Sequence, residues 1–119
     1  MNADQAIAAH REWKNRFLAA MGEQKQLNVD EIEADNCCAF GKWLYGRGKT
    51  DFGQTANYQK CVAAHAAFHL EAAKVARLVN EGKLQAATSM LMSGTPYAQA
   101  SEALTIKVIG MFKESSPQD

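Results

Sequence analysis

The chain has 119 residues, of which 47% are hydrophobic, and its 13 basic side chains balance 13 acidic ones to a formal net charge of zero. A chain of this length can bury a hydrophobic core without disulfides, and its composition is that of a folded domain rather than a disordered one. No basic excess is available to neutralise phosphates. We therefore expect a single domain over residues 1–119 with no nucleic acid as a partner.

The start of the chain and its cysteines indicate a cytoplasmic protein. Residues 1–5 (MNADQ) lack the basic start and apolar run of a secretory signal, and no apolar stretch approaches the roughly 20 residues that a bilayer requires. Three cysteines, two of them adjacent, are an odd number that does not suggest a disulfide framework. We expect reduced thiols, a cytoplasmic location and no membrane contact by this chain.

The first predicted helix covers about residues 3–21 and ends at Gly22. Its apolar stripe recurs at spacings of three and four residues, which is typical of an amphipathic helix. The polar residues 23–36 that follow are interpreted as a connection with a helical turn around Asp30. The stripe consists of Ile7, His10, Trp13, Phe17 and Met21.

A short helix is predicted next, over residues 38–45. Asp35 or Asn36 is expected to cap its N-terminus, because both side chains accept hydrogen bonds from free helix N–H groups. Gly46 is expected to stop it. The glycine-rich residues 46–53 are predicted to form a turn.

Two longer helical segments complete the chain. One helix is predicted over residues 55–80, and a fourth helical run begins at Lys83. This run is interrupted at residues 93–96, where a threonine can cap and a proline can open the last helix. The last helix is expected to reach Phe112, followed by a frayed tail over residues 113–119. The pattern predicts an all-α fold, an antiparallel four-helix bundle with one short additional helix.

All three histidines lie on stripes assigned to the core. His65 and His69 are four residues apart, so their imidazoles leave one face of a helix and two ring nitrogens can reach one metal ion. His10 lies on the inward face of the first helix. Three buried imidazoles without a carboxylate on the stripe are unfavourable unless something satisfies them. The pattern indicates a metal site; three core histidines with hydrogen-bond partners are the alternative.

A closed zinc site has four ligands, and three cysteines compete for the fourth position. Cys61 lies one turn before His65 but about 12 Å along the helix axis from His69, so we expect it to be a structural core residue. Cys37 and Cys38 both lie at the start of the short helix, where free N–H groups favour a thiolate. Spacing alone does not choose between these two.

Three sequence motifs, in order, resemble those of the chemoreceptor zinc-binding (CZB) family. Residues 10–14 (HREWK) resemble its first motif, a histidine followed by Trp-Lys. Residues 38–43 (CAFGKW) match its pattern of Cys, any residue, Leu or Phe, Gly, any residue and Trp. Residues 65–69 (HAAFH) resemble its paired histidines. The resemblance covers about residues 5–112.

This resemblance implies that His10, Cys38, His65 and His69 bind one zinc ion, and that Cys37 has no ligand role. The family is usually joined to a chemoreceptor signalling domain or a diguanylate cyclase. The resemblance therefore implies a regulatory or sensory domain of bacterial chemotaxis or cyclic-di-GMP signalling. Its stimulus would be the zinc level or oxidation of the bound cysteine. Neither output domain is present in these residues, and both a stand-alone regulator and a piece of a longer protein remain open.

Self-association is also expected. The last helix carries the apolar side chains of Ile106, Ile109 and Phe112 beyond its main stripe, more than one face of a small bundle needs to bury. Family members are also found as dimers or within dimeric receptors. We therefore expect a homodimer.

The sequence has two alternative interpretations, a metal-dependent hydrolase and a helical interaction module without a functional metal. The hydrolase conflicts with the sequence because Ala66 replaces the glutamate of the His-Glu-x-x-His signature. Four protein ligands would also leave no open position for water. The interaction module leaves three inward histidines unexplained. We predict no catalytic residue and no enzymatic activity.

Overall fold

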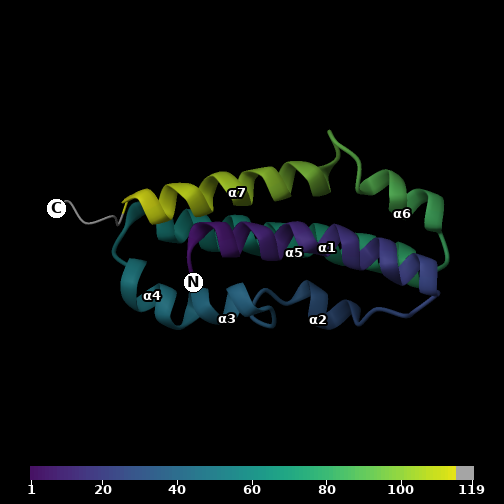
Figure 1. Cartoon of the computed structure of the whole chain (residues 1–119), viewed down its shortest axis with the longest axis horizontal. Helices are drawn as coiled ribbons and strands as arrows, with labels where there is room; N and C mark the ends of the chain where they lie inside the picture. Colours follow the sequence, from purple (N-terminus) through teal and green to yellow (C-terminus); the bar gives the residue numbers. More distant parts are fainter. Residues whose placement is uncertain (115–119) are drawn as a thin grey trace.

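The computed structural model describes residues 1–114, and every regular element in that range is an α-helix. The all-α bundle predicted from the sequence is confirmed. Three long helices lie side by side along an elongated molecule, accompanied by four short ones (Figure 1). The helices are α1 (Ala3–Glu23), α2 (Val29–Glu33), α3 (Ala39–Tyr45), α4 (Arg47–Phe52), α5 (Ala56–Asn80), α6 (Leu84–Met90) and α7 (Pro96–Glu114).

The chain passes along the bundle four times in alternating directions (Figure 1). Helix α1 makes the first pass, α2, α3 and α4 together make the second, α5 makes the third, and α6 and α7 make the fourth. Helix α5 contacts α1, α2, α6 and α7. The antiparallel arrangement is as predicted. The number of short helices differs, since two passes are divided into short segments and the sequence predicted only one short helix.

Helix α1 begins at a capping box and runs past its predicted end. The Asn2 side chain accepts from the Gln5 N–H, and the Gln5 side chain accepts from the Asn2 N–H. At the other end the helix continues through Gly22 to Glu23, so the predicted stop at Gly22 is wrong. Gln24 ends the helix in the left-handed conformation, with a φ of 55°. The sequence predicted that Gly22 would end the helix.

The connection after α1 is attached to the far end of α5. The Asn80 side chain accepts from the Leu27 N–H at 2.8 Å and donates to the Leu27 carbonyl at 2.8 Å. Asn28 then caps α2 by accepting a backbone N–H at 3.1 Å. Helix α2 confirms the helical turn expected around Asp30, and it buries Ile32 against the core.

The N-cap of α3 is Cys38 and neither Asp35 nor Asn36, so that prediction is wrong. The Cys38 Sγ atom accepts from the Gly41 N–H at 3.2 Å. The Asp35 carboxylate accepts from the Tyr45 hydroxyl at the other end of α3, so it is not available at the N-terminus. The thiol therefore occupies the cap position.

Residues 46–53 include helix α4 and are not the predicted turn. The Gly46 N–H donates to the carbonyls of Lys42 and Trp43, both at 3.1 Å, which closes α3. A Cβ atom added at Gly48 would lie 2.9 Å from the Trp43 ring. The glycines therefore permit close packing between two consecutive short helices. The sequence predicted a turn because glycines are also frequent in turns.

The third and fourth passes agree closely with the predicted boundaries. Thr95 accepts from the Ala98 N–H at 3.2 Å ahead of α7, as expected. Thr55, predicted as the first residue of the third helix, is the N-cap of α5. Helix α7 extends to Glu114 rather than Phe112. The predicted frayed tail is therefore wrong at residues 113 and 114, and its residues 115–119 lie outside the described range.

Helix α7 is attached at its end to the start of α5. The Glu114 carboxylate accepts from the N–H groups of Ala56 and Asn57 at 3.1 and 2.8 Å. These donors belong to the first turn of α5, where a carboxylate is favoured, and the same bonds lower the pKa of Glu114. The contact fixes the relative position of the two helices.

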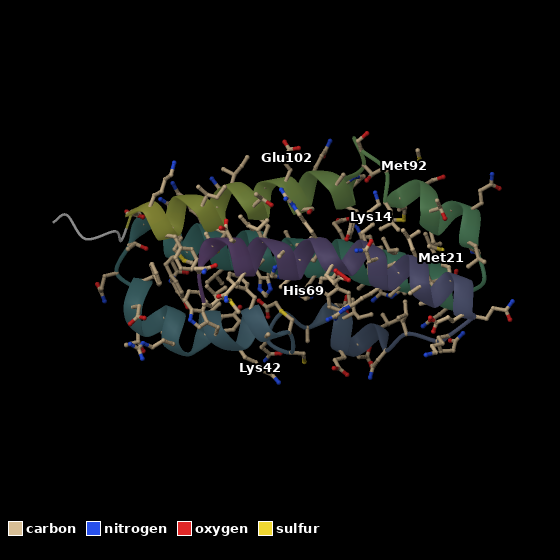
Figure 2. All side chains as sticks on the ribbon, in the orientation of Figure 1. Lys14, Met21, Lys42, His69, Met92 and Glu102 are labelled. Atoms are coloured by element: carbon tan, nitrogen blue, oxygen red, sulfur yellow. The ribbon has the colours of Figure 1, made fainter. Side chains whose placement is uncertain are left out.

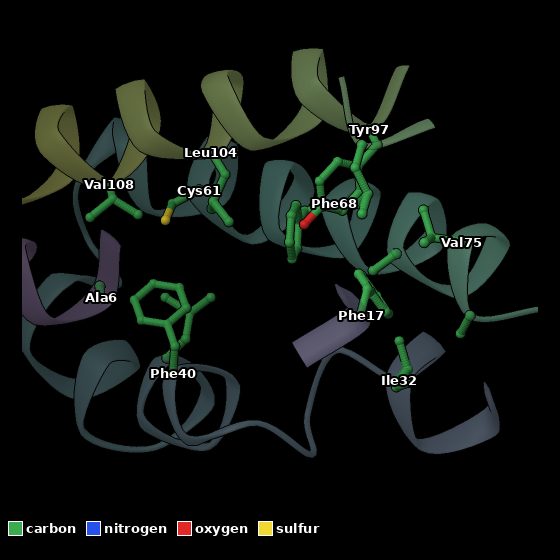
Figure 3. Packing of buried hydrophobic residues seen from close by; sticks show 14 of the residues in the cluster. Ala6, Phe17, Ile32, Phe40, Cys61, Phe68, Val75, Tyr97, Leu104 and Val108 are labelled. Atoms are coloured by element: carbon green, nitrogen blue, oxygen red, sulfur yellow. The ribbon is translucent and has the colours of Figure 1, made fainter. Parts of the chain in front are cut away.

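The core lies between the four passes, and charged side chains point outward. Lys42 and Glu102 lie on the outside of the bundle, whereas His69 lies inside it (Figure 2). Figure 3 shows the aromatic and aliphatic side chains that fill the space between the helices. The largest of the fully buried apolar side chains are Phe17, Phe40, Phe68, Leu44, Leu104 and Met111.

Gly41 allows α3 to pack against the chain that precedes it. A Cβ atom at this position would overlap the carbonyl oxygen of Asp35, which is backbone and cannot rotate away. We predict that Gly41→Ala lowers the free energy of unfolding by about 1–3 kcal/mol, measured by urea denaturation. Gly22→Ala is the matched control, because nothing lies within 4 Å of a Cβ atom there. Alanine at Gly22 should leave stability unchanged or raise it; equal effects of the two variants would contradict the argument.

Candidate metal centre

The four residues proposed as ligands come together in the bundle. His10 comes from α1, Cys38 from the N-terminus of α3, and His65 and His69 from α5. One donor atom from each residue lies within 4.8 Å of all the others. The three imidazoles are buried, with exposed fractions of 4%, 0% and 1%, and Cys38 is half-buried. The residues at positions 10, 38, 65 and 69 thus form one group placed to hold a metal ion.

The spacing of the donor atoms matches a tetrahedral zinc site. Cys38 Sγ lies 3.4 Å from His65 Nε2 and 3.5 Å from His69 Nε2, and the two nitrogens are 3.1 Å apart. Zinc bonds of about 2.05 Å to nitrogen and 2.3 Å to sulfur give tetrahedron edges of about 3.3 Å (N···N) and 3.6 Å (N···S). The three measured edges are within about 0.2 Å of these values, so Cys38, His65 and His69 already have the spacing of zinc ligands. The donor atom of His10 lies within 4.8 Å of theirs.

Backbone carbonyls orient two of the imidazoles. His10 Nδ1 lies 2.9 Å from the Ala6 carbonyl, and His69 Nδ1 lies 2.7 Å from the Ile32 carbonyl. A carbonyl can only accept, so Nδ1 carries the proton in both rings and Nε2 keeps its lone pair. Carbonyl partners of this kind commonly orient metal-binding histidines.

The remaining ring nitrogens are consistent with a bound cation. His10 Nε2 and His65 Nδ1 are buried and have no hydrogen-bond partner among the described residues. His69 Nε2 directs its lone pair toward His65 Nε2 and the Cys38 sulfur. Buried polar atoms are normally satisfied. A cation among these atoms would satisfy the inward nitrogens, although His65 Nδ1 would still lack a partner.

Burial controls the protonation of these groups. Desolvation lowers the pKa of His10 to about 4 and that of His65 to about 2, and it lowers the pKa of His69 as well. Desolvation also raises the pKa of the Cys38 thiol, against the opposing effect of backbone N–H groups at the start of α3. The N–H groups at the helix start thus favour the thiolate, as expected, but burial outweighs them. A bound cation would reverse this balance.

Aromatic rings surround the histidines. The Phe40 ring lies 5.1 Å from the rings of both His10 and His65, edge to face, and the Phe68 ring lies 5.3 Å from that of His10. These two phenylalanines limit the access of water to the group. Trp43 lies further out, with its ring 5.7 Å from that of Phe40 and stacked on Phe112 at 5.5 Å.

One side of the group is open to solvent through a pocket of about 240 Å³. Three of the four candidate ligands line it, and His65 does not. Small molecules can therefore approach the sulfur atom without separating the helices. The polar residues of the pocket are His10, Cys38, His69, Cys37, Arg16 and Glu31.

The other two cysteines occupy different environments. Cys61 is fully buried, and its side chain points toward Leu104 and Val108 of α7 (Figure 3). Burial raises the pKa of the Cys61 thiol to about 12. Cys37 is exposed. All three thiols are free, and only Cys38 joins the histidine group.

Sequence reasoning missed the groups that orient the candidate ligands. The Ala6 carbonyl could have been found, because it lies one helical turn before His10. The Ile32 carbonyl could not have been found from the sequence. His69 lies 37 residues further along the chain, and no local pattern places α2 against it. The contact of the Asp35 carbonyl with Gly41 was also missed.

The fold and the donor group define a helical bundle with a buried site of three nitrogens and one sulfur. The sequence profile of the chemoreceptor zinc-binding domain family matches residues 10–76, more than half of the chain. The chain belongs to this family, and its cofactor is zinc. The match is shorter than the expected range of about 5–112, but it contains all four candidate ligands. No curated protein and no solved structure matches the chain.

The family is one of zinc-binding domains and not a known enzyme family. Among residues 1–114, no helix is both long and apolar enough to span a bilayer.

The metal-free protein should lose stability in mild acid. Histidines with a pKa lowered by folding bind protons more readily in the unfolded chain, so their contribution is complete above about pH 6.5 and declines as the pH falls toward the folded value. For His10, with a pKa of about 4, the loss between pH 7 and pH 5 is up to about 2 kcal/mol. Urea denaturation of metal-free protein at several pH values measures it.

The control for this prediction is His65→Gln, which removes one buried imidazole. Glutamine does not titrate in this range, so the variant should depend less steeply on pH than the parent protein. An unchanged pH dependence would show that His65 does not contribute.

Proposed function

We propose that this chain is a regulatory or sensory domain that binds one zinc ion through His10, Cys38, His65 and His69. The observation that carries the proposal is the convergence of four donor atoms within 4.8 Å from three separate parts of the chain. The membership of the family supports zinc as the ion. Bound there, zinc would join α1, the start of α3 and α5, so that ligand loss changes how these segments pack.

The ligand set supports regulation rather than catalysis. Four protein donors complete a tetrahedron and leave no position for a substrate water, as in structural zinc sites. One donor is a sulfur atom that oxidants can modify, and it lies on the open side of the group. We propose that the domain responds to the zinc level or to oxidation of Cys38.

The proposed setting is the bacterial cytoplasm. A zinc-binding thiol requires a reducing compartment to remain a thiol. The output would be a chemoreceptor signalling domain or a diguanylate cyclase, in keeping with the family's usual partners. One alternative, a helical interaction module without metal, would leave the buried Nε2 atom of His10 without a partner among the described residues.

Ligand replacement tests the proposed site. Cys38→Ala, His65→Ala and His69→Ala should each reduce the zinc content of purified protein from one ion per chain and weaken zinc affinity by at least about tenfold. Cys37→Ala and Cys61→Ala are matched controls, because these thiols lie outside the group. Metal analysis and competition with a chromogenic chelator provide the measurements. A Cys61→Ala protein without metal, or X-ray absorption indicating two sulfur ligands, would overturn the ligand set.

We also propose that the domain forms a homodimer through the exposed face of α7. Ile106 and Ile109 are 57% and 38% exposed, and both lie beside α1 in shallow pockets that include Arg11. Phe112, which the sequence placed with them, instead packs on Trp43. The candidate interface is therefore smaller than expected from the sequence.

Light scattering tests this interface. The protein should give a mass of about twice 13.0 kDa at high micromolar concentration. The double variant Ile106→Glu, Ile109→Glu should give a monomer with unchanged zinc content, because neither residue belongs to the donor group. A monomeric parent protein at that concentration would reject the homodimer.

A further inference from the structure

Cys37 has a position that the proposed zinc site does not explain. It is exposed, it immediately precedes Cys38, and both residues line the pocket that opens onto the donor group. An oxidant that reaches the sulfur of Cys38 therefore arrives where a second thiol is present. Cys61 offers no such thiol, because it is fully buried against α7 (Figure 3).

The local structure leaves Cys37 free to turn toward its neighbour. Both cysteines precede the first residue of α3, Ala39, so the peptide bond between them is not part of a helix. The Cys37 thiol donates a hydrogen bond to Asn36 Oδ1 at 3.6 Å. A thiol is a weak donor, so this contact is easily lost.

We propose that Cys37 is the resolving thiol of Cys38, so that oxidation of Cys38 ends in a disulfide between the two adjacent cysteines. The inference rests on the proposed function, in which Cys38 is the oxidisable zinc ligand. Cys37 then acts only after oxidation and takes no part in holding the metal.

The chemistry balances with a two-electron oxidant such as hydrogen peroxide. The Cys38 thiolate attacks one peroxide oxygen, the O–O bond breaks, hydroxide leaves, and the sulfur becomes a sulfenic acid. The Cys37 thiolate then attacks the Cys38 sulfur. The S–O bond breaks, the S–S bond forms, and the departing hydroxide takes a proton to leave as water.

The disulfide between adjacent cysteines is strained, and this strain makes its formation reversible. Adjacent Cα atoms are about 3.8 Å apart, whereas the Cα atoms of most disulfides are about 4.4–6.8 Å apart. Strained disulfides are reduced easily. Reduction would regenerate both thiols and the sulfur ligand. Without Cys37, the sulfenic acid of Cys38 would be open to further oxidation to sulfinic acid, which thiol reductants do not reverse.

Peptide mass spectrometry of the whole protein after oxidation tests the proposal. Trypsin releases residues 26–42, which contain Cys37 and Cys38, apart from residues 61–74, which contain Cys61. The protein is treated with hydrogen peroxide, its remaining thiols are alkylated, and its zinc content is measured before and after a dithiol reductant. Cys37→Ala is compared with the matched control Cys61→Ala.

We expect the parent protein and Cys61→Ala to yield peptide 26–42 lighter by two hydrogen atoms and unalkylated. Both should recover their zinc binding after reduction. Cys37→Ala should bind zinc normally at first but yield sulfinic acid at Cys38 and recover little zinc binding. A link from 26–42 to 61–74 or to a second copy of 26–42, or sulfinic acid in the parent protein, would overturn the role of Cys37. Zinc loss without any modification of Cys38 would overturn the proposed oxidation response itself.

Discussion

Three imidazoles are buried at the centre of this bundle, and none of them has a carboxylate as hydrogen-bond partner among residues 1–114. Desolvation keeps the rings neutral, and two backbone carbonyls satisfy the outer nitrogens of His10 and His69. The inward nitrogens and the Cys38 sulfur are left facing one another. A cation held among these atoms would satisfy several lone pairs at once, and its binding would then be thermodynamically linked to the folding of the bundle.

The histidines were predictable because helical periodicity fixes which face of a helix is buried. Thr95 was equally informative, since a side-chain cap marks a helix start in sequence and structure alike. Glycines were less informative about where helices end. Gly22 lies inside α1, whereas Gly46 and Gly48 permit contact between α3 and α4, because a missing side chain serves close packing as well as turns.

The choice between the adjacent cysteines needed three-dimensional information. Spacing placed both thiols at the start of a helix, and only family resemblance favoured Cys38. In the structure the chain from Asp35 lies against Gly41, and the Gly41 N–H donates to the Cys38 sulfur. This contact turns one thiol inward and leaves Cys37 at the surface. The same sulfur is thus both a candidate ligand and the cap of α3, so a change at that atom alters the end of a helix.

The second pass of the chain is built from helices of five, seven and six residues. Isolated helices of this length are unstable in water, so α2, α3 and α4 depend on the long helices for their structure. Such segments are expected to open by local unfolding, well below the free energy that disrupts the whole bundle. Because Cys38 is the only candidate ligand on this pass, its opening would expose the histidines while α1 and α5 remain paired. Metal exchange would then proceed at the rate of that local opening, and amide hydrogen exchange in α3 would follow the same kinetics.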